Sequence, residues 1–121
     1  MMIAHLESTA RALEALDVED LLTQYASQFV FEDTAAGLTI TDREGLRGYF
    51  ERLFSIPGVA FSDVVMFEDG RGHGGGEWVW SGLDPSGRPF RVRGASIFEV
   101  AESGITRESI YYQPPGAPAG A

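Results

Sequence analysis

The sequence predicts a single α+β domain in which helices pack on one face of a curved antiparallel sheet. The first half carries apolar residues at helical spacing, and the second half carries four β-rich segments separated by turn residues. A length of 121 residues suits one domain. No run approaches the ~18 apolar residues of a membrane span, and no secretory signal is visible, so we expect a cytoplasmic protein.

The N-terminal third is expected to form two helices and a strand. Apolar residues recur at every third or fourth position from Ile3 to Leu16, which gives one apolar stripe. Asp17 is the expected N-cap of a second, short helix that carries apolar residues between positions 18 and 25. The aromatic and β-branched segment 28–33 predicts a strand that ends at Asp33.

A third helix is predicted after the loop formed by residues 35–37. Thr41 and Glu44 have the spacing of a capping box, which makes Thr41 the expected N-cap. The apolar face of this helix consists of Leu46, Tyr49, Phe50, Leu53 and Phe54.

The second half predicts four strands, over residues 59–67, 77–83, 90–100 and 105–113. Short turns between them indicate antiparallel pairing. The glycine-rich segment 68–76, which contains His73, is expected to be a flexible hairpin loop. We expect the domain to cover residues 1–113 and the Pro/Gly/Ala-rich tail 114–121 to be disordered.

Composition excludes several kinds of chemistry. The chain has no Cys and no Lys, which rules out thiolate catalysis, cysteine-ligated zinc, Schiff bases and phosphate loops built on lysine. Its two His residues lack metal-ligand spacing, so we expect neither a metal nor another cofactor. A net charge of −9 argues against nucleic-acid binding, and nothing in the sequence suggests a membrane partner.

The element order, the segment Phe29–Asp33 and the stretch from Gly87 to Gln113 resemble the nuclear-transport-factor-2-like superfamily, in its SnoaL-like branch. This branch includes polyketide cyclases and lies close to the ketosteroid isomerases. The resemblance covers about residues 3–113. It implies a cone-shaped sheet that encloses an apolar pocket, and a homodimer formed through the outer face of the sheet.

Asp33 matches the position of the general-base aspartate in ketosteroid isomerases, and the resemblance therefore implies a catalytic base there. The alternative is a strand-end Asp that forms a turn or caps a neighbour. Ala12 stands where those isomerases carry their tyrosine. Ala95, or Gly94 or Ser96 in a shifted register, stands where they carry a protonated aspartate. That specific activity is therefore rejected.

The limonene-epoxide-hydrolase branch is rejected as well, because Ile110 stands at the position of its final-strand aspartate. Arg91 and Arg93 could form an ion pair with Glu108 on the neighbouring strand or bind an anion. The alternative is a pair of exposed side chains on one face of the sheet.

The expected pocket residues come from both halves of the chain. Trp78 and Trp80 share one face of a strand by alternation, and they either line the pocket or pack in the core. The full set of expected substrate-binding residues is Trp78, Trp80, Tyr112, Phe50, Phe54 and Ser96.

Three hypotheses for function follow. The first is a small enzyme that transfers a proton on a hydrophobic, carbonyl-containing molecule, with Asp33 as base. The second is a non-catalytic protein that binds a hydrophobic ligand in the same pocket. The third is a dimeric interaction module whose cavity is filled by its own side chains.

Overall fold

The computed structural model describes residues 3–116 of the chain, so residues 117–121 of the predicted disordered tail lie outside the described part. The helices are α1 (Ile3–Glu14), α2 (Val18–Thr23) and α3 (Arg43–Phe54). The strands are β1 (Tyr25–Asp33), β2 (Leu38–Ile40), β3 (Ala60–Glu68), β4 (His73–Leu83), β5 (Pro89–Ala101) and β6 (Gly104–Tyr112).

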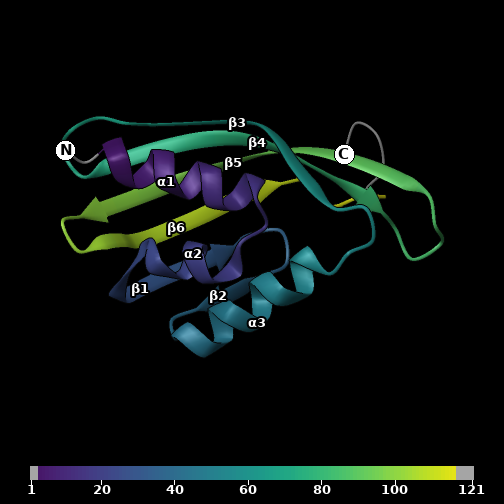
Figure 1. Ribbon diagram of the computed structural model, residues 1–121, viewed down its shortest axis with the longest axis horizontal. Coiled ribbons are helices and arrows are strands. Elements are labelled where there is room, and N and C mark those ends of the chain that lie inside the picture. Colours follow the sequence, from purple (N-terminus) through teal and green to yellow (C-terminus); the bar gives the residue numbers. More distant parts are fainter. Residues whose placement is uncertain (1–2, 117–121) are drawn as a thin grey trace.

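The six strands form one curved, unclosed sheet in the order β2-β1-β6-β5-β4-β3, and all three helices come from the N-terminal half. Figure 1 shows the three helices on the same side of this sheet. The predicted α+β class and cone-shaped sheet are therefore confirmed. One pairing departs from the antiparallel prediction, because β1 lies parallel to β6. The two strands are joined by a long crossover that contains α3 and four strands, whereas a short hairpin can join only antiparallel strands.

The predicted cap of α2 is confirmed, since the Asp17 side chain accepts a hydrogen bond from the Asp20 N–H. The predicted cap of α3 is wrong by one residue. Asp42, not Thr41, accepts the hydrogen bond from the Gly45 N–H, at 2.8 Å. A Cβ atom at Gly45 would lie 2.8 Å from the Asp42 carboxylate, so the glycine leaves room for this cap.

The glycine-rich segment is also more regular than predicted. Strand β4 begins at His73, and the three glycines after it pair with β3 on one side and β5 on the other. A Cβ atom at Gly74 would lie 2.6 Å from the Phe67 carbonyl oxygen and 2.7 Å from a Leu6 methyl group. These glycines therefore permit close strand and helix packing, and the connecting loop shrinks to residues 69–72.

The core lies between the helices and the inner face of the sheet, where Leu6, Phe31, Leu46 and Phe98 are fully buried. The outer face instead exposes large apolar side chains, namely Val65, Phe67, Ile97 and Tyr111. Homodimer formation through this face stays a prediction. None of the described helices is long and apolar enough to cross a bilayer.

Candidate functional site

A cavity of about 60 Å³ lies between the inner face of the sheet and helices α1 and α3. This is far smaller than the ~300 Å³ at which sites for drug-sized ligands begin. Most of its lining is aromatic or aliphatic, and Glu108 is the one carboxylic acid among the described lining residues. The lining residues are Leu13, Phe31, Tyr49, Phe50, Leu53, Phe61, Trp78, Trp80, Glu108, Ile110 and Tyr112.

Glu108 lies in the middle of β6, between the buried rings of Phe31 on β1 and Phe98 on β5. The Tyr25 hydroxyl donates a hydrogen bond to its Oε1, and the Ser96 hydroxyl donates one to its Oε2 at 3.1 Å. Burial raises the pKa of Glu108 to about 7, while these two hydrogen bonds act in the opposite direction. Both protonation states are therefore populated near neutral pH, as an acid–base group requires.

A hydrogen-bond chain extends from Glu108 across two further strands. The Trp78 Nε1–H donates to Ser96 Oγ at 2.9 Å, and Ser96 in turn donates to Glu108. The Trp78 indole lies against Gly94, where any Cβ atom would overlap the ring. Strands β4, β5, β6 and β1 thus each contribute one member of a buried polar chain, in the order Trp78, Ser96, Glu108 and Tyr25.

Asp33 ends β1 and is buried, with 3% of its surface exposed. The hydroxyls of Tyr49 and Tyr112 donate to its Oδ2 at 2.8 and 2.9 Å, and the Ala36 N–H donates to its Oδ1 at 3.0 Å. Asp33 is not among the residues that line the cavity, whereas both tyrosines are. The tyrosines therefore stand between this carboxylate and any ligand.

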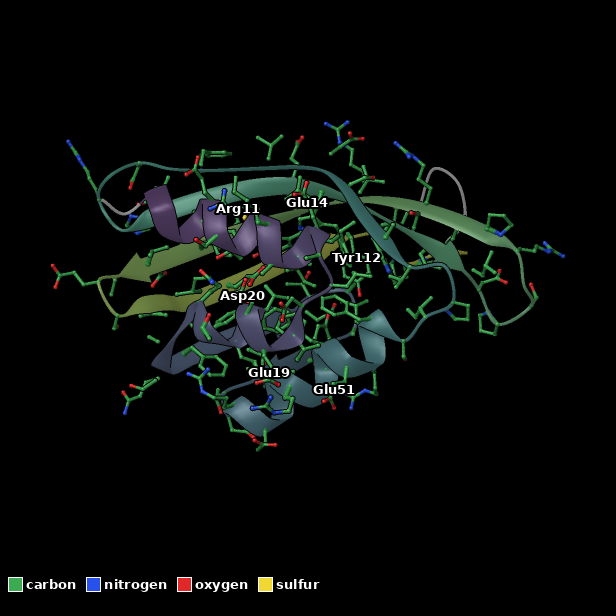
Figure 2. The ribbon with its side chains drawn as sticks, viewed as in Figure 1. Arg11, Glu14, Glu19, Asp20, Glu51 and Tyr112 are labelled. Atoms are coloured by element: carbon green, nitrogen blue, oxygen red, sulfur yellow. The ribbon has the colours of Figure 1, made fainter. Side chains whose placement is uncertain are left out.

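The two tyrosines remain protonated at physiological pH. Burial and the adjacent Asp33 carboxylate raise the pKa of both Tyr49 and Tyr112 well above the usual value of 10.0. Figure 2 shows Tyr112 in the space between the sheet and the helices, whereas the labelled Glu19 and Glu51 lie on the helical side of the molecule. Since each tyrosine donates its proton to Asp33, it offers a ligand the lone pairs of its oxygen.

The structure brings four of the six expected pocket residues to the cavity wall, namely Trp78, Trp80, Tyr112 and Phe50. Phe54 lies one layer behind, stacked on Phe50 with ring centroids 5.8 Å apart. Ser96 also lies behind the wall, where it is hydrogen-bonded to two lining residues, Trp78 and Glu108. The Trp80 Nε1 is buried without a hydrogen-bond partner among the described residues.

Of the two alternatives for Arg91 and Arg93, the structure shows exposed side chains, whereas Glu108 is buried. The expected alternative pairing of Glu108 with Arg91 or Arg93 is not formed, because Arg91 pairs with Asp63 and Arg93 with Glu77 on the exposed face. A signal was available in the sequence. Glu108 lies four residues before Tyr112 in the same strand, so alternation places both on the face already expected to line the pocket.

A second hollow, an open groove of about 540 Å³, lies between residues 89–93 and 113–116. Its two guanidinium groups belong to the already paired Arg91 and Arg93, so the groove presents no free cationic group to an anion. Among the side chains that the structure describes, no three from His, Cys, Asp or Glu are placed to hold a metal ion. The cavity beside Glu108 is therefore the candidate site.

Solved structures share this fold across nearly the whole chain. One is a hypothetical protein from Catenulispora acidiphila with a ketosteroid-isomerase-like fold, solved in complex with trimethylamine. It is 25% identical to this chain with a TM-score of 0.77, and the match covers 90% of this chain and 85% of that chain. A protein from Pseudomonas putida, proposed to be a polyketide cyclase, is 15% identical with a TM-score of 0.80, covering 93% and 92%. The comparison with curated proteins gives no match.

The sequence itself also matches a family model. Residues 6–108 match the model of the SnoaL-like domain, which is most of the described chain. The strand order and curved sheet agree with that assignment, as does the resemblance found in the sequence. The chain therefore belongs to the SnoaL-like domain family.

Proposed function

We propose that this protein is a small-molecule enzyme of the isomerase or cyclase type in which Glu108 takes up and returns a proton. The observation that carries the proposal is a carboxyl group with a pKa of about 7 on the wall of an apolar cavity. General acid–base catalysis is most efficient when the pKa of the catalytic group lies near the working pH.

The substrate would be a small, largely apolar molecule with a carbonyl group. Ionised Glu108 removes a proton from the carbon beside the carbonyl, and the electron pair of the broken C–H bond moves into an enolate. Protonated Glu108 then returns the proton to another atom of the same molecule. One carboxyl group can serve both steps, because the two forms of Glu108 are nearly equal in free energy near neutral pH.

Asp33 has a different role in this proposal. Its carboxylate holds the Tyr49 and Tyr112 hydroxyls in place and thereby shapes the cavity. The alternative assignment of Asp33 as the base stays a prediction from the resemblance. It would require a substrate proton to pass through one of the tyrosine hydroxyls.

The test is Glu108→Gln, with Asp33→Asn as the matched carboxylate control. A panel of small ketones is incubated with the protein in D2O, and deuterium uptake beside the carbonyl is followed by mass spectrometry. We expect Glu108→Gln to slow uptake by about 100-fold or more, the usual contribution of a general acid–base group. Uptake that survives in Glu108→Gln and is lost in folded Asp33→Asn would return the role of base to Asp33.

A second candidate function is binding of a small alkylammonium ion without turnover. Aromatic faces surround a cavity whose only charged group among the described lining residues is an acid, which is the composition of a cation–π cage. The Catenulispora protein, 25% identical, was solved with trimethylamine, which supports this candidate.

Calorimetry with tetramethylammonium, which is charged at every pH, tests the second candidate. Because Glu108 ionises near pH 7, we expect affinity to rise up to about tenfold from pH 6 to pH 8, and Glu108→Gln to remove the rise. Neutral tert-butanol serves as the control of similar shape. Equal affinities for the two compounds would exclude selection by charge.

A further inference from the structure

We propose that Trp78 is a positioning residue for Glu108, because its indole N–H fixes the Ser96 hydroxyl in the orientation that donates to the carboxylate. The importance of this arrangement for turnover rests on the role proposed for Glu108. The hydrogen bonds themselves are independent of that role. Trp78 itself is hydrogen-bonded to Ser96 and not to Glu108. It acts through the 2.9 Å hydrogen bond to Ser96 Oγ and the 3.1 Å hydrogen bond from Ser96 to Glu108 Oε2.

The direction of this chain follows from the chemistry of its members. An indole N–H can only donate, so Ser96 Oγ must accept from Trp78. A serine hydroxyl carries a single proton, and here that proton lies toward Glu108. If the Trp78 donor were removed, the Ser96 hydroxyl would lose the contact that fixes its rotation, and its proton could turn away from Glu108. Trp78 thus biases Ser96 toward the ionised form of the acid.

The indole is held firmly enough for this task. It is 95% buried, and its ring contacts the rings of Phe61 and Tyr112 with centroids 6.0 and 6.1 Å away. Its distal edge occupies the space above Gly94 that a side chain would fill. Movement of the indole away from Ser96 would therefore require its aromatic neighbours to move as well.

The other groups that face Glu108 are neutral. Tyr25 on β1 donates to its second oxygen, and Tyr49 on α3 lies near enough for the Glu108 carboxylate to raise the tyrosine pKa. Burial keeps both tyrosines protonated by raising the pKa of each. Leu13 of α1 and Phe98 of β5 add only apolar surface. Burial raises the pKa of Glu108, and the hydrogen bonds from Tyr25 and Ser96 lower it.

The experiment follows the titration of the Glu108 side-chain carboxyl by ¹³C NMR in the full chain. Ser96→Ala should raise its pKa by about one pH unit, because a hydrogen bond to the charged form is lost. Trp78→Phe should raise it by a smaller amount. The double variant should show no more shift than Ser96→Ala alone, because Trp78 acts through Ser96. Ser109→Ala is the matched control, since this buried serine donates to Glu32 instead.

Gly94→Ala keeps the indole but displaces it, and it should shift the titration in the same direction as Trp78→Phe. This second variant keeps the test valid if Trp78→Phe does not fold. No shift in Gly94→Ala and Trp78→Phe, or a double variant equal to the sum of its parts, would overturn the inference. A downward shift would do so as well, because it indicates entry of water.

This readout is separate from turnover. Deuterium uptake that persists in Glu108→Gln would refute the proposed function while leaving the titration result intact. Conversely, Glu108→Gln could abolish deuterium uptake while Trp78→Phe leaves the pKa of Glu108 unchanged. That result would refute only the role of Trp78 and would leave the proposed function standing.

Discussion

Asp33 and Glu108 are buried carboxylates on the inner face of the sheet, and their surroundings contrast. Asp33 lies at the end of β1 and receives three hydrogen bonds, one of them from the main chain of the following turn. Glu108 lies in the middle of β6 between two phenyl rings, receives two, and borders the cavity. Asp33, with more hydrogen-bond donors and no contact with the cavity, suits a carboxylate that holds its neighbours in place. Glu108, with fewer donors and a position on the cavity wall, suits a carboxylate that exchanges a proton with a ligand.

The largest expected effect on stability is that of Asp33→Asn. This change removes the charge and places an amide N–H₂ group among three donors, so it should reduce the free energy of unfolding by about 3 kcal/mol. Urea unfolding followed by tryptophan fluorescence measures the loss. Glu108→Gln, the matched change, should cost clearly less at pH 8, because it relieves the burial of a charge. Equal losses would contradict the contrast between the two sites.

A second prediction concerns the pH dependence of stability. Glu108 has a folded-state pKa of about 7 against 4.5 for the free side chain. The folded chain therefore binds more protons than the unfolded chain between these values, and stability falls as the pH rises. The contribution of Glu108 is greatest below pH 4.5 and is lost as the pH rises through 7, a change of about 3 kcal/mol. Parallel urea profiles of wild type and Glu108→Gln from pH 4.5 to 8 would contradict it.

The smallest expected effect is that of Tyr112→Phe, which removes one of the three donors to Asp33 and keeps the ring. We expect a loss of about 1 kcal/mol in the free energy of unfolding, typical of one hydrogen bond. Because Tyr49 still donates to the same oxygen, the double variant Tyr49→Phe/Tyr112→Phe should lose more than the sum of the single changes. Simple additivity in urea unfolding would show that the two donors act independently.

Much of the fold could be predicted from local pattern. Helical spacing located the helices, the Asp17 cap was found from residue type, and turn residues separated the long strands of the second half. The errors came from contacts between distant segments. The strand register of residues 73–76 depends on close approach by β3 and α1, and the parallel pairing of β1 with β6 joins segments from opposite ends of the chain.

The site was predicted less completely than the fold. Alternation placed Trp78 and Trp80 on the cavity face, and it could have placed Glu108 there as well. It could not show that Tyr49 and Tyr112 cover Asp33, because these three residues come from α3, β6 and β1 and meet only in the folded chain. Family resemblance pointed to Asp33 and gave no information about those partners.

The parallel pairing of β1 with β6 also has a consequence for folding kinetics. Tyr25 and Glu108 are 83 residues apart, and Asp33 and Tyr112 are 79 apart, so closing either contact costs substantial loop entropy. Contacts of such long sequence separation slow folding. Helices and hairpins can form earlier, but both acid sites require β6 to dock beside β1. We therefore expect the final docking of the sheet and the assembly of the site to be the same late event.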